Sequence, residues 1–196
     1  MKTIMKQIYI IEHLEPKLFP WCMIEYKHIS KTVGKSSLWF TNINPKDKNA
    51  KALEQLGKVI NQSVRDLKLD SVCILDPDAS QQLTPKDSKQ FKYFIFGGIL
   101  GDYPPKKRTK AELTQFLPGK EKRNIGKKQF STDNAVYVTW KIANGESMKM
   151  MKFKNKFELP INKVETIILP YLYPIVNGKH RISDELIAFL KNKKEF

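Results

Sequence analysis

The stretch from Phe91 to Thr109, FKYFIFGGILGDYPPKKRT, contains the most informative pattern of the chain. Residues 93–96 are an unbroken aromatic and β-branched run, which is typical of a strand buried on both faces in a parallel sheet. Glycines at 97, 98 and 101 follow at once. Because glycine lets a backbone approach a ligand closely, this pattern predicts a ligand loop, although its GGxxG spacing is not the GxGxxG of dinucleotide-binding folds. The alternative is a connection that needs glycine for geometry alone.

A carboxylate and a basic cluster follow the glycines. Asp102 stands at the edge of the predicted loop, and the prolines at 104–105 cannot continue a strand. Residues 106–108 (KKR) then add three positive charges. Thr109 and Glu112 have the spacing of a capping box, which predicts that a helix begins there.

Strand and helix patterns alternate along the rest of the chain. Apolar runs predict strands at residues 7–11, 38–40, 72–75 and 164–169, the last of them bounded by Pro160 and Pro170. Apolar residues at helical spacing predict helices at residues 20–33, 52–60, 132–143 and 184–193. This alternation favours an α/β fold with a mostly parallel sheet flanked by helices.

Length and composition suit one globular domain. The chain has 196 residues, of which 41% are hydrophobic. No apolar run approaches the roughly 20 residues of a membrane span, and no secretory segment is expected near Met1. The only two cysteines, Cys22 and Cys73, lie in apolar segments. We expect buried free thiols in a reducing, cytoplasmic compartment, with no metal site and no membrane association.

Positive charge is concentrated in one part of the sequence. The chain has 35 basic and 20 acidic residues, a net charge of +15. Residues 104–156 hold 14 basic and four acidic side chains, a net charge of +10. Such a segment attracts phosphate backbones without sequence-specific contacts. We therefore expect contact with ribosomal RNA through Lys106, Lys107, Lys127 and Lys128, and the alternative is a solvated lysine-rich surface.

Four blocks lie in order along the first two-thirds of the chain: IIEHLE at 10–15, CILDPDA at 73–79, FGGILGDYPPKKRT at 96–109 and IGKKQFSTDNA at 125–135. Together they resemble the SPOUT (α/β-knot) methyltransferases. More narrowly, they resemble a small eukaryotic and archaeal branch that contains a fungal enzyme methylating an arginine of a small-subunit ribosomal protein. The resemblance implies one SPOUT domain over residues 1–196, a C-terminal trefoil knot, the cofactor S-adenosylmethionine (SAM), and a monomer.

In SPOUT proteins three loops hold SAM, and the quoted blocks supply the matching positions. The resemblance places the adenine against the backbone near Ile125, Gln129 and Phe130. The full set of implied cofactor contacts is Leu75, Asp76, Gly97, Gly98, Ile99, Gly101, Gly126, Gln129, Phe130, Thr132, Asp133 and Ala135. Each of these residues has an ordinary turn or capping role as its alternative.

Methyl transfer depends on positioning and on control of the acceptor's proton. A guanidinium is protonated at neutral pH, so an arginine acceptor needs carboxylates to orient it and to receive a proton. Glu12 and Asp102 both follow predicted strands and are the candidate catalytic acids, because ligands of parallel sheets bind beyond the carboxyl ends of the strands. Arg108 is expected to hold the cofactor carboxylate or a phosphate through a bidentate pair.

Three functions follow from these patterns. The first is a SAM-dependent methyltransferase acting on an arginine of a ribosomal protein. The second is an rRNA or tRNA methyltransferase of the same fold, although RNA-directed SPOUT enzymes often carry a catalytic arginine early in the chain and the first arginine here is Arg65. The third is a basic ribosome-binding factor without enzymatic activity.

Overall fold

The computed structural model describes residues 6–101, 104 and 106–192. Its main sheet has six strands in the order β3-β2-β1-β5-β4-β6, and every neighbouring pair is parallel. The strands are β1 (Ile8–His13), β2 (Leu38–Thr41), β3 (Lys58–Val59), β4 (Val72–Leu75), β5 (Tyr93–Gly98) and β6 (Glu121–Arg123). The predicted mostly parallel α/β fold is confirmed.

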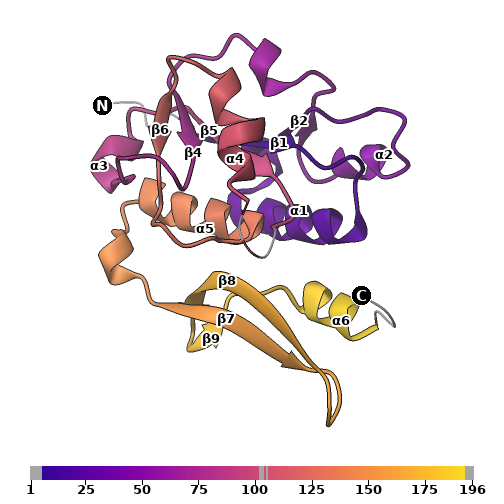
Figure 1. Cartoon of the computed structure of the whole chain (residues 1–196). Helices are drawn as coiled ribbons and strands as arrows, with labels where there is room; N and C mark the ends of the chain where they lie inside the picture. The colour runs from indigo at the N-terminus through magenta and orange to yellow at the C-terminus, as the bar shows by residue number, and fades with distance from the viewer. Residues whose placement is uncertain (1–5, 102–103, 105, 193–196) are drawn as a thin grey trace.

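A second, antiparallel sheet is built from the last third of the chain. Its strands are β7 (Phe153–Pro160), β8 (Thr166–Val176) and β9 (Lys179–His180). The helices are α1 (Pro20–Val33), α2 (Ala50–Leu53), α3 (Pro85–Ser88), α4 (Arg108–Glu112), α5 (Thr132–Ala143) and α6 (Asp184–Asn192). Figure 1 shows α1 and α5 between the parallel sheet above and the antiparallel sheet with α6 below.

Three apolar clusters hold these layers together. The first lies between the parallel sheet and helices α1 and α5 and includes Ile11, Phe94 and Val136. The second covers the other face of the sheet and includes Ile10, Ile95 and Leu113. The third joins the outer side of α1 to the antiparallel sheet and α6 through Ile24, Tyr173 and Leu190.

Strands β1 and β5 form the middle of the parallel sheet. Successive residues of β1 enter opposite clusters, because side chains of a strand alternate between its two faces. The register pairs Glu12 with Gly97 and His13 with Gly98. The carboxyl ends of β1, β4 and β5 therefore meet at one edge, where parallel sheets bind their ligands.

The expected helix over residues 52–60 is wrong. Helix α2 ends at Leu53, and the amide of Ile60 donates a hydrogen bond to the carbonyl of Phe40 at 2.8 Å. Gly57 explains the break, because a Cβ atom at this position would lie 2.5 Å from the carbonyl oxygen of Leu38. The apolar residues after Gly57 therefore extend the sheet as β3 beside β2.

The expected end of a strand at Pro170 is also wrong, since β8 continues to Val176. The β7–β8 register shifts between Asn155 and Phe157, where Lys156 has a left-handed φ of 48°. Pro170 lies opposite this bulge, so its missing N–H removes no regular ladder hydrogen bond.

Two helix starts can be compared with their predicted caps. Helix α6, expected over residues 184–193, begins after Ser183, whose Oγ accepts a hydrogen bond from the amide of Leu186 at 3.0 Å. The capping box at Thr109 is wrong. Helix α4 begins one residue earlier, after Lys107 with its left-handed φ of 54°, and Thr109 lies inside the helix.

Other sequence-based expectations concern the thiols, the chain path and membranes. Cys22 and Cys73 are both buried and free. The trefoil knot stays a prediction from the resemblance. Within residues 6–101, 104 and 106–192, no helix is long and apolar enough to cross a membrane.

Candidate active site

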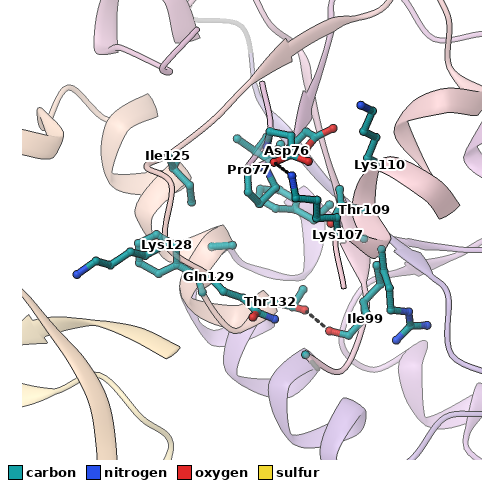
Figure 2. Close-up of a pocket in the computed structure, with 18 of the residues that line it drawn as sticks. Asp76, Pro77, Ile99, Lys107, Thr109, Lys110, Ile125, Lys128, Gln129 and Thr132 are labelled. Atoms are coloured by element: carbon teal, nitrogen blue, oxygen red, sulfur yellow. Dashed lines mark hydrogen bonds and ion pairs between the residues drawn. The ribbon is translucent and has the colours of Figure 1, made fainter. Parts of the chain in front are cut away.

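A cavity of about 240 Å³ lies at the carboxyl edge of the parallel sheet (Figure 2). Three segments line it: residues 75–78 after β4, residues at the end of β5 and on into α4, and residues 125–135 at the start of α5. It lies where parallel α/β sheets commonly bind ligands.

Ten of the twelve predicted cofactor residues line this one cavity. They are Leu75, Asp76, Gly97, Ile99, Gly101, Gly126, Gln129, Phe130, Thr132 and Ala135. Their positions span 60 residues of sequence, and the parallel sheet brings them together because its strands end at the same edge. Ile125, the other predicted adenine neighbour, also lines the cavity.

Hydrogen bonds fix two of the three segments, the one after β5 and the one at the start of α5, relative to each other and to β8. The hydroxyl of Thr132 donates to the carbonyl of Ile99 at 3.4 Å, as Figure 2 shows. The hydroxyl of Tyr171 in β8 donates to the carbonyl of Gly101 at 3.0 Å. The amide of Leu172 in β8 donates to the carbonyl of Gln129 at 2.8 Å. Strand β8 therefore supports two of the three cavity segments.

Glycine is required by the packing at Gly101 and by the backbone at Gly126. A Cβ atom at position 101 would lie 2.5 Å from Nε2 of Gln129 and 2.6 Å from Cε1 of Tyr171. Gly126 has a φ of 106°, a conformation that L side chains rarely adopt. Both glycines keep the backbone close to the cavity, as the sequence predicts.

Gly98 does not line the cavity. A Cβ atom there would lie 2.5 Å from the hydroxyl of Tyr26 and 2.9 Å from Cγ2 of Ile11, in the core beside α1. Since Gly97 lines the cavity, the next residue of the strand faces away from it. The two glycines thus have different roles.

Asp133 also lies outside the cavity lining. Its Oδ2 atom lies 2.6 Å from Nδ1 of His28 and 3.5 Å from Nη1 of Arg181, and the hydroxyl of Ser131 donates to its Oδ1 at 2.6 Å. Burial opposes the charged form, but the contacts with His28 and Arg181 hold the pKa of Asp133 below its ordinary value. It belongs to a buried ionic network under the first turn of α5.

Glu12, a predicted catalytic acid, is fully buried and does not line the cavity. Its carboxylate accepts hydrogen bonds from the hydroxyls of Thr41 and Ser63, both at 2.5 Å, and from the amide of Val64 at 2.9 Å. These contacts tie β1 to β2 and to the turn at residues 63–66. A catalytic role for Glu12 stays a prediction.

Arg108 lines the cavity, as predicted, but its guanidinium is committed to two carboxylates. Its Nε donates to Oε1 of Glu112 at 2.6 Å and its Nη1 donates to Oε1 of Glu15 at 2.8 Å. Glu112 first, and then Glu15, raises the pKa of Arg108 above its ordinary value. Glu15 also accepts from the amide of Leu100 at 2.9 Å, so this pair braces the glycine loop. Asp102 lies outside the described residues.

Sequence reasoning missed several residues of the lining, namely Pro77, Asp78, Phe96, Thr109 and Lys110. The first four stand inside two of the four blocks that carry the resemblance, so the blocks themselves could have indicated them. Asp78 is the most informative, because its Oδ1 lies 3.4 Å from Nζ of Lys107 at the cavity.

The electrostatics of the cavity are mixed. Asp76 is buried and accepts a hydrogen bond from the amide of Asp78 at 2.9 Å. The basic lining consists of Lys106, Lys107, Arg108, Lys110, Lys127 and Lys128. In the part of the chain that the structure describes, no group of three His, Cys, Asp or Glu side chains is arranged to hold a metal ion.

A mostly parallel sheet with a three-segment cavity at its carboxyl edge agrees with the SPOUT methyltransferase class, which the sequence blocks resemble. A family model described as protein arginine N-methyltransferase SFM1-like matches residues 8–195. The chain therefore belongs to the SFM1-like family of protein arginine N-methyltransferases.

Named relatives agree with this assignment. Protein arginine N-methyltransferase SFM1 of Saccharomyces cerevisiae is 34% identical over 200 residues, which cover 93% of each chain. The crystal structure of the yeast arginine methyltransferase SFM1 complexed with SAM has a TM-score of 0.86 at 32% identity, over 95% of this chain and 91% of that chain. A dual specific Trm10 from Thermococcus kodakaraensis shares the fold, with a TM-score of 0.58 at 18% identity over 72% of this chain and 95% of that chain.

Proposed function

We propose that this chain is a SAM-dependent protein arginine N-methyltransferase. The observation that carries the proposal is the gathering of ten predicted cofactor residues around one cavity at the carboxyl edge of the sheet. The yeast relative that was crystallised with SAM has the same fold over 95% of this chain, which supports the same cofactor here.

The chemistry of the lining fits SAM. For a flat adenine the cavity has the apolar side chains of Leu75, Phe96, Ile125 and Phe130. For a ribose diol it has the polar groups of Asp76, Gln129 and Thr132. Gly97 and Gly101 allow the backbone to approach a ligand closely. Bound SAM supplies an electrophilic methyl group on a sulfonium sulfur. The contribution of the protein is to orient the acceptor in line with that methyl group and to exclude water.

We further propose that the acceptor is an arginine of a ribosomal protein. A guanidinium needs carboxylates that orient it and receive its proton. Asp78 is the described carboxylate best placed for this, because its side chain is 34% exposed and lies at the cavity. Asp102, one residue after Gly101, stays the second candidate acid. Arg108 acts by bracing the glycine loop at Leu100 through Glu15.

The proposed setting follows from charge and thiol chemistry. Lys106, Lys107, Lys127 and Lys128 are exposed around the cavity, which favours contact with ribosomal RNA near the acceptor protein. Two buried free thiols suit the cytoplasm. We propose that residues 1–196 act as one domain and, following the resemblance, as a monomer.

A labelling experiment tests the proposal. Radiolabelled SAM is incubated with the protein and small ribosomal subunits, and the label is then divided between protein and RNA. We expect label in one ribosomal protein, recovered as methylarginine after hydrolysis, and its loss with Gly101→Val. Label found only in RNA would favour the RNA methyltransferase instead. Binding to subunits with no transfer of label would favour the ribosome-binding factor.

A further inference from the structure

Arg181 joins the C-terminal part of the chain to the floor of the cavity. It follows β9 directly, and its amide donates a hydrogen bond to the carbonyl of Pro174 in β8 at 2.8 Å. Only 10% of its side chain is exposed. The antiparallel sheet therefore holds the backbone of Arg181, while its guanidinium contacts α1 and α5.

The guanidinium is satisfied by groups from two helices. Its Nη2 donates to the hydroxyl of Thr32 in α1 at 2.7 Å, and its Nη1 donates to Oδ1 of Asn134 in α5 at 2.9 Å. Nη1 also lies 3.5 Å from the Asp133 carboxylate, and the guanidinium carbon lies 4.3 Å from the ring centre of Tyr137. Arg181 thus contacts the first two turns of α5 from the side of the antiparallel sheet.

The same turn of α5 completes the cavity. Thr132 and Ala135 line it, while the neighbouring Asp133 and Asn134 turn away from it toward Arg181. The hydroxyl of Thr132 also contacts the glycine loop at Ile99. Any shift of this turn therefore moves the cavity wall and the contact between two of its three segments.

We propose that Arg181 is a positioning residue for cofactor binding, which holds the first turn of α5 where the cavity needs it. The inference rests on the proposed function, because it names a residue that acts on the proposed SAM site. The physical reason is the cost of weakening the compensation of a buried charge. Without Arg181, the Asp133 carboxylate loses its guanidinium neighbour and keeps the side chains of His28 and Ser131, and Asn134 loses a donor. The turn would relax toward other partners, and the cavity would lose its shape.

The inference extends to strand β8. The amide of Leu172 and the hydroxyl of Tyr171 hold Gln129 and Gly101, and Arg181 holds the first turn of α5. Strand β8 and Arg181 therefore support the cofactor site from behind, although none of the cavity lining comes from them.

The test measures SAM affinity by calorimetry at a temperature where each variant is folded. Arg181→Met should weaken binding by about tenfold, the lower end of what partners behind a binding site typically contribute. The matched control is Leu190→Ala in α6, which removes packing from the third apolar cluster but does not touch α5. The control should lower the thermal midpoint and leave SAM affinity unchanged.

A second pair of variants covers the case in which Arg181→Met does not fold. Thr32→Val removes one hydrogen bond from Arg181, and Arg181→Lys keeps the charge but loses the fork geometry. Both should weaken SAM binding, Arg181→Lys more than Thr32→Val. Unchanged affinity in folded Arg181 variants would overturn the inference, as would an equal loss in Leu190→Ala. Failure of the wild-type protein to bind SAM would instead refute the proposed function.

Discussion

The Nζ atom of Lys107 lies 3.4 Å from the Oδ1 atom of Asp78. A lysine of the protein itself therefore pairs with the carboxylate that we propose binds the acceptor guanidinium. The two side chains are 74% and 34% exposed, so the pair is weak and can open. An arginine acceptor would compete with Lys107 for Asp78.

Asp78→Asn should therefore raise the KM for an arginine-containing acceptor by roughly tenfold, the effect of losing one charge-assisted hydrogen bond. Lys107→Gln should lower the same KM, because it removes the competitor. Steady-state assays at saturating SAM measure both, with the exposed Asp70→Asn as the control. An unchanged KM in both variants would exclude Asp78 from acceptor recognition.

Gly98 and Gly101 should respond differently to substitution. Gly98→Ala places a Cβ atom 2.5 Å from the Tyr26 hydroxyl and 3.0 Å from the Glu12 carbonyl oxygen, in a closely packed core. The free energy of unfolding should fall by about 1–3 kcal/mol, while the folded fraction still binds SAM. Gly101→Ala should instead weaken SAM binding more than stability, because Gly101 and its neighbour Gln129 both line the cavity. Urea unfolding and calorimetry on the two variants decide, and equal losses of affinity would contradict the assignment.

The sequence is sufficient to predict the central strands and most of the site. The apolar side chains at residues 93–96 require a strand that is buried on both faces. Parallel strands place their carboxyl ends at one edge of the sheet, whatever the sequence of the segments that connect them. The strand pattern therefore predicts which edge of the sheet holds a site, and the resemblance to the SPOUT methyltransferases supplies the particular residues after β4 and β5.

Local sequence does not determine the face that each residue presents or the partner that it finds at long range. Gly97 and Gly98 are equivalent in a motif but face opposite sides of β5. Asp133 stands in a cofactor block, yet its partner Arg181 lies 48 residues later in the chain. The helix expected over 52–60 failed for a similar reason, because the contact of Gly57 with β2 overrides local helical spacing.

The four lysines around the cavity should make binding to ribosomal RNA depend on salt. If Lys106, Lys107, Lys127 and Lys128 each neutralise one phosphate, their joint replacement by Gln should reduce the slope of log affinity against log salt by about 3. Replacement of Lys35, Lys46, Lys48 and Lys51, which are also exposed but lie away from the cavity, is the matched control. Equal slopes for the two quadruple variants would mean that these lysines are only solvated surface.

Glu12→Gln separates a structural from a catalytic carboxylate. Glutamine keeps the size of the side chain, but an amide nitrogen replaces one carboxylate oxygen and cannot accept a hydrogen bond. Either the bond from Ser63 to Oε1 or the bonds from Thr41 and Val64 to Oε2 are therefore lost. We expect a loss of about 1–3 kcal/mol in the free energy of unfolding, with activity following the folded fraction. Single-turnover rates on fully folded protein check this. A fall on the order of 10²–10⁴ in rate without loss of stability would instead establish the catalytic role predicted from the sequence.

Glu25 should make the free energy of unfolding depend on pH, at pH values above those at which ordinary carboxylates titrate. Its side chain is buried beneath α5, where its Oε1 accepts a hydrogen bond from Nε1 of Trp21 at 2.9 Å. Burial first, and the nearby Asp133 charge second, raises its pKa from 4.5 to about 8. Between these pH values the folded state keeps a proton that the unfolded state has released, so the free energy of unfolding falls as the pH rises. The contribution is complete only below pH 4.5.

Glu25→Gln removes this titration while keeping the acceptor for Trp21. In denaturant unfolding from about pH 5 to about pH 8.5, the free energy of unfolding should decline with pH in the wild-type protein and decline clearly less in the variant. The two slopes should differ by at most about 1.4 kcal/mol per pH unit, the value for one proton. Glu185→Gln, which removes an exposed carboxylate paired with Lys27, should leave the decline unchanged. His28 and Asp133 face the same buried space and are present in all three proteins. Parallel curves for the wild type and Glu25→Gln would refute the assignment of the decline to Glu25.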